Sequence, residues 1–204
     1  MEHKSWKRTF AILWSGQAVS IFTSAVIQMA IVWYITDKTK SAAALSIATL
    51  IGFLPQALLG PFVGVFIDRH DRKRIMICAD LFIAAATGVL VYAGFKGEIP
   101  IVLIYVVLFM RSLGSTFHEP SLQAITPLIV PADHLTKCAG YSQTFESISM
   151  LLSPAAAAGL FALFGIEKIL ILDIAGAAFA MITIAFLSIP KLIKEDEKIP
   201  NVLR

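Results

Sequence analysis

Six long apolar stretches constrain the fold of this chain more than any other feature of its sequence. A helix needs about 20 apolar residues to cross the hydrocarbon core of a bilayer. A helix also satisfies its own backbone hydrogen bonds in lipid. The predicted helices cover residues 10–35, 42–67, 75–95, 99–117, 139–164 and 169–189. The expected fold class is an all-α membrane protein with six transmembrane helices, and the predicted bundle occupies residues 1–190.

Composition agrees with a chain that lies in lipid. Hydrophobic residues make up 57% of the sequence and charged residues 15%, whereas about a quarter of the residues in a soluble domain are charged. The net charge of +3 is confined to short connectors and forms no basic face, so nucleic acid is not an expected partner. Cys78 and Cys138 fit neither a disulfide framework nor metal-ligand spacing. We expect no metal and no cofactor.

The distribution of Lys and Arg predicts the orientation of the chain. Twelve lie in the N-terminal segment, the second-to-third and fourth-to-fifth connectors and the tail, against four in the other connectors. Positive residues concentrate on the cytoplasmic side of membrane proteins. Both termini are therefore expected in the cytoplasm, with the bilayer as the surrounding partner.

Four of the predicted spans each contain one charged residue. Such a group costs about 2.5–3.5 kcal/mol at the bilayer centre, so it normally faces a partner, water or the bundle interior. Arg111 and Glu146 fall at similar depths near the midplane, which suggests an ion pair. That pair is either a structural clamp or a charge switch in a substrate or proton pathway. Asp80 and Asp173 lie near span ends, where a structural role is favoured.

Other polar residues leave two alternatives open at each position. Gln17 and Gln28 are about three helical turns apart and share roughly one face of the first span. That face is expected to point inward, either lining a cavity or packing on a neighbour. His118 and Glu119 precede Pro120 at the predicted end of the fourth span. A wet helix end explains them at least as well as a proton relay does.

The connector "GVFIDRHDRKR", residues 64–74, carries charges in an order that opposes both helix dipoles. Asp68 ends one predicted helix, and Arg72, Lys73 and Arg74 begin the next. Orientation accounts for the basic cluster but not for Asp68, because acids contribute little to orientation. Asp68 would be favourable facing the N-terminus of another helix.

This connector resembles the loop motif of the major facilitator superfamily, G-x-x-x-D-[RK]-x-G-[RK]-[RK]. The matching residues are Gly64, Asp68, Arg69, Arg72 and Lys73. Asp71 stands where the motif has glycine, which puts the expected tight turn in question. "RSLG", beginning at Arg111, is loosely similar to a fourth-span motif of the superfamily. "SPAAAAG" resembles a degenerate fifth-span antiporter motif, with Ser153, Pro154 and Gly159.

Longer segments are similar to the macrolide-efflux branch of drug:proton antiporters, among them "WSGQAVSIFTSAVIQMAIVWYIT" and "PADHLTKCAGYSQ". The resemblance implies export of lipophilic macrolides across a bacterial plasma membrane in exchange for protons, without covalent chemistry. Siderophore exporters are the nearest alternative. The implied substrate and proton pathway comprises Gln17, Gln28, Arg111 and Glu146, and the 64–74 loop is an implied conformational latch.

The resemblance is to the N-terminal half of a major facilitator fold, which has twelve spans in two halves. Residues 191–204 resemble the start of the cytoplasmic central linker. The implied partner is a missing C-terminal six-span half, and a transport-inactive fragment is the alternative. A membrane enzyme is disfavoured, since the sequence has no Ser–His or HExxH arrangement.

Overall fold

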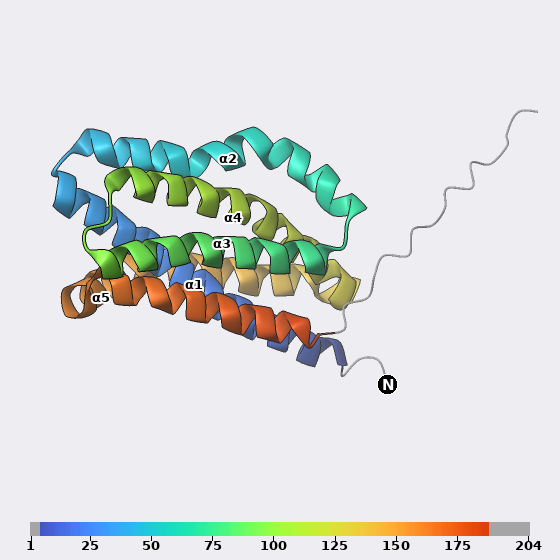
Figure 1. Cartoon of the computed structure of the whole chain (residues 1–204). Coiled ribbons are helices and arrows are strands. Elements are labelled where there is room, and N and C mark those ends of the chain that lie inside the picture. The colour runs from blue at the N-terminus through green and yellow to red at the C-terminus, as the bar shows by residue number, and fades with distance from the viewer. Residues whose placement is uncertain (1–4, 188–204) are drawn as a thin grey trace, which may run out of the picture.

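The computed structural model describes residues 5–187 as a bundle of long α-helices, with no strand in that range (Figure 1). The helices are α1 (Ser5–Thr39), α2 (Ala42–Arg69), α3 (Arg72–Lys96), α4 (Ile101–Ile129) and α5 (Leu135–Ala185), and a 3-10 turn, η2 (Ala132–His134), precedes α5. The prediction of an all-α chain is confirmed for these residues. The predicted linker at 191–204 lies outside the described residues.

The described chain has five helices long and apolar enough to cross a membrane, against six predicted spans. The difference lies in α5, which covers the region of the last two predicted spans. Gly165 has φ 74° and ψ 170°, a backbone conformation that is essentially restricted to glycine. The ribbon of α5 turns back on itself at one end of the bundle (Figure 1). Two arms, residues 135–164 and 166–185, therefore lie on either side of Gly165.

Helix α4 runs well beyond its predicted end at residue 117. It continues to Ile129 with Pro120 and Pro127 inside it. Proline removes one backbone hydrogen bond from a helix interior, but transmembrane helices tolerate this when neighbouring groups satisfy the freed carbonyl. A wet helix end was one of the two alternatives for His118 and Glu119, and the end of α4 does not fall at these residues. They lie eleven and ten residues before the end of α4.

Small residues allow the helices to approach closely. A Cβ added at Gly16 would collide with Thr183, and one at Gly176 would collide with Thr23. Both glycines thus lie where α1 packs against the second arm of α5. Such small-residue contacts replace the hydrophobic driving force that helices lack in lipid. In contrast, α2 lies along one edge of the bundle (Figure 1) and buries few of its residues.

Two apolar clusters fill the core, and a layer of polar side chains separates them. The larger cluster includes Ile27, Ile31 and Leu90, and the smaller one includes Leu13 and Ile125. Along each of α1, α3, α4 and the second arm of α5, buried polar residues fall between the two clusters. They include Gln17, Ser20, Asp80, Arg111, Thr116, His118, Ser121 and Asp173. Thr87 lies beside them, at the edge of the larger cluster. The polar groups are therefore collected in one zone of the bundle.

One end of the bundle carries most of the described basic residues. The start of α1, the α2–α3 connector and both ends of α5 meet there (Figure 1). We call it the basic end, and its Lys and Arg residues are Lys7, Arg8, Arg69, Arg72, Lys73, Arg74 and Lys137.

Candidate functional site

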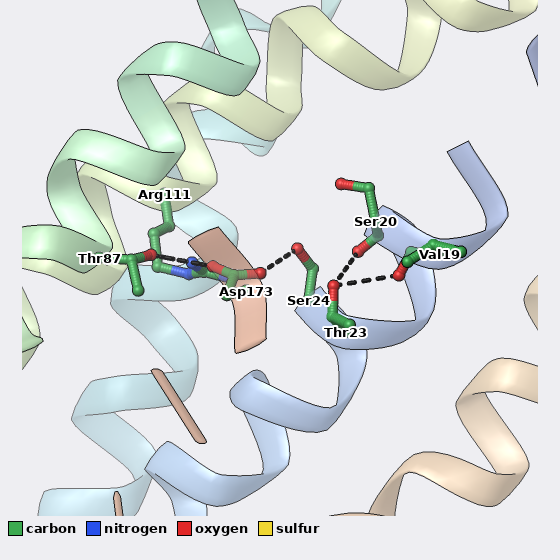
Figure 2. Close-up of polar contacts among 7 residues, drawn as sticks. All are labelled: Val19, Ser20, Thr23, Ser24, Thr87, Arg111 and Asp173. Atoms are coloured by element: carbon green, nitrogen blue, oxygen red, sulfur yellow. Dashed lines mark hydrogen bonds and ion pairs between the residues drawn. The ribbon is translucent and has the colours of Figure 1, made fainter. Parts of the chain in front are cut away.

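Arg111 lies in the centre of a buried network that joins four helices. Its side chain, on α4, contacts the Asp173 carboxylate on α5 and the Thr87 hydroxyl on α3. Thr87 donates a hydrogen bond of 2.9 Å to the same Asp173 oxygen, and Ser24 on α1 donates one of 2.7 Å to the other. Figure 2 shows these side chains converging on Asp173. Both carboxylate oxygens are thus satisfied.

The predicted pairing of Arg111 with Glu146 is therefore wrong, because Asp173 takes that place. Similar depth along two helices does not establish that two side chains face each other, since each helix can be rotated about its axis. Asp173 shares its face of the helix with Gly176, Ala177 and Ala180, at helical spacing. That run of small residues marks a packed face, and it was the available signal that Asp173 points inward.

This ion pair is arranged to hold the bundle together. The side chains of Arg111 and Asp173 are 7% and 2% exposed, and every oxygen of the carboxylate has a donor. Removing one partner of a buried pair leaves an uncompensated charge and is strongly destabilising. Of the two alternatives for Arg111, a structural clamp and a charge switch, this geometry favours the clamp.

A cavity of about 650 Å³ opens between α1, α4 and the first arm of α5, towards the basic end. Apolar side chains such as Trp14 and Leu122 line it together with polar ones such as Gln123 and Gln143. Three titratable residues, His118, Glu119 and Glu146, also line it. Apolar walls with a few polar groups are typical of small-molecule sites. Glu146 therefore lies at the cavity and not at Arg111.

Gln17 is fully buried, and neither side-chain atom has a hydrogen-bond partner among the described residues. It lies on α1 between Trp14 and Ile21, at the three- and four-residue spacings that keep all three on one face. An unpaired buried amide is costly and calls for an explanation. Gln28, by comparison, is half-buried, and neither glutamine is among the residues that line the cavity.

His118 and Asp80 approach each other beside the cavity. The side chain of His118 on α4 is 9% exposed and that of Asp80 on α3 is 4% exposed. His118 Nε2 lies 3.3 Å from Asp80 Oδ1. The approach does not have hydrogen-bond geometry, and His118 Nε2 and Asp80 Oδ2 have no hydrogen-bond partner in the described chain. The sequence did not predict that these two residues meet.

The 64–74 connector is tied to the bundle by its basic residues. Arg72 donates 3.1 Å and 2.7 Å hydrogen bonds to Asp68 and to the Ala124 carbonyl of α4. Lys73 donates to the carbonyls of Ala185 and Leu187 at the end of α5, at 2.9 Å and 2.7 Å. A cation at a helix C-terminus is favourable, so α5 compensates for the unfavourable position of Lys73 in its own helix.

Asp71 explains the departure from the loop motif. It is the N-cap of α3, with φ −71° and ψ 106°, and its side chain accepts a hydrogen bond from the Arg74 N–H at 3.2 Å. An aspartate is among the best N-cap residues, and this backbone conformation does not need glycine. The side chain of Asp68 stays 71% exposed.

The fifth-span motif residues differ in their environment. Ser153 is buried and donates to the Met150 carbonyl at 3.3 Å. Pro154 and Gly159 are exposed, and a Cβ at Gly159 would meet nothing within 4 Å. Helix α5 continues through Pro154 and loses its helical geometry at Gly165 instead.

At the end opposite the basic end, an exposed ion pair joins α1 to the α3–α4 connector. Lys38 Nζ lies 2.5 Å from Glu98 Oε1. The hydrogen bond from Lys38 holds the pKa of Glu98 below its usual value. Exposed pairs contribute little to stability, so this contact is peripheral to the polar layer.

The chain is similar to known proteins along its whole length. A sequence profile described as Major Facilitator Superfamily matches residues 13–202. Macrolide efflux protein A of Streptococcus pyogenes is 52% identical over 204 residues, which cover 100% of this chain and 50% of that protein. Macrolide efflux protein A of Enterococcus faecalis is 50% identical over 165 residues, which cover 80% of this chain and 51% of that protein.

A more distant relative is the Uncharacterized MFS-type transporter YkuC of Bacillus subtilis (strain 168). It is 31% identical over 185 residues, which cover 90% of this chain and 43% of that protein. The chain thus spans about half the length of the curated relatives it matches.

Proposed function

Because this chain belongs to the major facilitator superfamily, we propose that it forms the first half of a secondary transporter that exports macrolide-type lipophilic drugs by proton antiport. The observation that carries the proposal is its 52% identity, over all 204 residues, with a protein named Macrolide efflux protein A. A second six-span half is the proposed partner. Substrate would bind between the halves, which rock to alternate access.

In the proposed topology the chain crosses a bacterial plasma membrane six times, with both ends in the cytoplasm. The two arms of α5 would each cross once. The shorter arm, residues 166–185, is about 30 Å long at 1.5 Å per residue, which matches the hydrocarbon thickness. The basic end would face the cytoplasm, since its seven Lys and Arg residues outnumber the four at the opposite end, Lys38, Lys40, Lys96 and Lys168.

In this proposal the cavity beside α1, α4 and α5 is the part of the substrate and proton pathway contributed by this half. Glu146 lines the cavity and would contact substrate or water there. Gln17 lies on the same face of α1 as the lining residues Trp14 and Ile21, and its unpaired amide would gain a partner if the pathway reaches it. Arg111 would act through the rigid network with Asp173, and Gln28 would have a lesser role. The open side of the cavity would be closed by the second half.

The 64–74 loop would act as a conformational latch. Its proposed residues are Gly64, Asp68, Arg69, Arg72 and Lys73. Arg72 and Lys73 anchor the loop to α4 and α5, while the exposed Asp68 carboxylate is available to face a helix N-terminus of the second half. The fifth-span residues Ser153, Pro154 and Gly159 would lie on the side that packs against that half.

Drug accumulation in bacteria tests the proposed function. A macrolide-susceptible strain would express this chain, the C-terminal half of the Streptococcus pyogenes relative, or both. We expect co-expression to lower accumulation of a radiolabelled macrolide severalfold, and an uncoupler to abolish the effect. Unchanged accumulation in every combination would contradict transport and favour the alternative of an inactive fragment. A decrease for a siderophore but not for a macrolide would favour the alternative substrate class.

A pair of matched variants connects that assay to the cavity. Gln17→Leu removes a buried amide that has no partner, so it should not reduce the amount of folded chain. It should reduce export if the amide contacts substrate. Ser15→Ala, at an exposed position two residues away, should leave export unchanged.

A further inference from the structure

Two buried ion-pair candidates occur in the polar layer, and they differ in how completely they are satisfied. Arg111 and Asp173 have donors for both carboxylate oxygens. Asp80 and His118 are buried to a similar extent, yet Asp80 Oδ2 and His118 Nε2 have no hydrogen-bond partner in the described chain. Ionisable groups inside a membrane usually mark ion or proton pathways. In the first pair both carboxylate oxygens accept hydrogen bonds, whereas in the second pair one nitrogen and one oxygen have no hydrogen-bond partner among the described residues.

Binding of a proton by His118 would turn its approach to Asp80 into an ion pair. A neutral imidazole with its Nε2 lone pair facing Asp80 would oppose the carboxylate. Protonation would give the imidazole a positive charge, and Nε2 lies 3.3 Å from Asp80 Oδ1, a distance at which opposite charges attract. Loading therefore requires one proton and breaks no bond in the protein.

The surroundings offer a route for that proton. His118 lines the cavity together with Glu119, its neighbour on α4, and Glu146 on the first arm of α5. Both carboxylates therefore share the cavity with His118.

Arg72 and Arg111 hold other partners. Arg72 on α3 donates from its two terminal nitrogens to the Ala124 carbonyl and to Asp68 at the end of α2, whereas its buried Nε has no hydrogen-bond partner among the described residues. Arg111 is paired with Asp173. Helix α1 contributes only neutral residues to the cavity, Trp14 and Ile21. Among the described residues, no group of three or more His, Cys, Asp and Glu side chains is arranged to hold a metal ion.

We propose that Asp80 and His118 form a proton-binding site, loaded from the cavity by way of Glu119 and Glu146. The binding site stands on the geometry of this chain. Its use in energising export rests on the proposed function. In that role, binding of a proton would lock α3 to α4, and its release would free them to shift between the two states of the transport cycle.

Nuclear magnetic resonance of the 204-residue chain in lipid nanodiscs tests the site without any transport assay. With ¹⁵N-labelled histidine, the His118 signal is identified by its loss in His118→Gln. We expect this signal to change as the pH is lowered from about 8 to about 5, the interval in which histidine changes its charge. In Asp80→Asn its proton affinity should fall at least about tenfold, because an opposite charge within about 4–6 Å favours the charged form.

Asp133→Asn, which removes an exposed carboxylate beside His134, is the matched control and should leave the His118 titration unchanged. The proposal is overturned if the His118 signal of the unmodified chain does not change over this interval. It is also overturned if the midpoint is the same in Asp80→Asn.

The co-expression assay then separates this site from the function itself. If export occurs, His118→Gln should abolish export against a drug gradient while leaving downhill equilibration of the drug. Export that responds fully to an uncoupler in His118→Gln would overturn the coupling role. If no combination exports drug, the proposed function fails, and the titration still decides whether the proton site exists.

Discussion

Asp173 contributes to the fold because its carboxylate neutralises the buried charge of Arg111, for which lipid offers no partner. Its two oxygens accept hydrogen bonds from Ser24 and Thr87 as well as contacting Arg111, so three other helices depend on one carboxylate. A buried pair is weak evidence of net stabilisation compared with an apolar replacement, but loss of one partner is expensive. The intact ion pair therefore need not add stability, whereas removal of Asp173 should lower the stability of the fold strongly.

Asp173→Ala should lower the stability of the chain by about 3–5 kcal/mol, because Arg111 would remain charged and buried. The midpoint of thermal unfolding in detergent, followed by the folded fraction in size-exclusion chromatography, measures this. The double variant Arg111→Met with Asp173→Leu should recover most of the loss. Glu146→Ala, at a half-buried position on the cavity, should change stability by no more than about 0.5 kcal/mol. Equal midpoints for Asp173→Ala and the unmodified chain would contradict the assignment.

Among the elements, the contact between α1 and the second arm of α5 depends on glycine. Gly176 lies against Thr23, whose hydroxyl is bonded to the Val19 and Ser20 carbonyls of its own helix. The Thr23 side chain is therefore held in place and cannot easily yield. The same close approach brings Ser24 within hydrogen-bond distance of Asp173.

Gly176→Ala should destabilise the chain by about 1–3 kcal/mol through overpacking. Gly159→Ala is the matched control on the first arm of α5, where a Cβ would meet nothing within 4 Å. It should be neutral or slightly stabilising, since alanine is the better helix former. Thr23→Ala combined with Gly176→Ala should restore the unfolding midpoint. If the two single variants behave alike, close packing at Gly176 is not the cause.

For the whole molecule, the reversal of α5 determines on which side of the membrane its ends lie. Gly165 takes a conformation that costs a non-glycine residue about 1–3 kcal/mol. The two arms run in opposite directions along α1, because Tyr141 in the first arm lies near Trp6 and Thr183 in the second lies near Gly16. Both ends of α5 consequently meet at the basic end.

Cysteine labelling tests that arrangement in cells. In a variant with Cys78 and Cys138 replaced by alanine, Lys40→Cys and Lys168→Cys should react with a membrane-impermeant maleimide in intact cells. Lys137→Cys and Ala185→Cys should react only after permeabilisation. Labelling of Ala185→Cys in intact cells would mean that α5 does not return across the membrane.

The sequence alone determined the class of the fold and most of its helices. Lengths of apolar sequence predict membrane helices directly, because the hydrocarbon core has a fixed thickness and every backbone group in it must be bonded. The predicted connector between the last two spans, residues 165–168, contains Gly165, where the helical geometry breaks. Motif residues pointed to the superfamily. The end of α4 was missed, because Pro120 is a poor stop signal in lipid.

Only the tertiary structure decided which polar residues meet. A helix that is apolar on all sides has no amphipathic pattern to show which face turns inward, so depth along the chain could be predicted but rotation about each axis could not. For that reason Arg111 was assigned Glu146 instead of Asp173, and the approach of His118 to Asp80 was not foreseen. Side-chain partners in this bundle follow from how the helices are rotated against one another, and close packing of small residues sets that rotation.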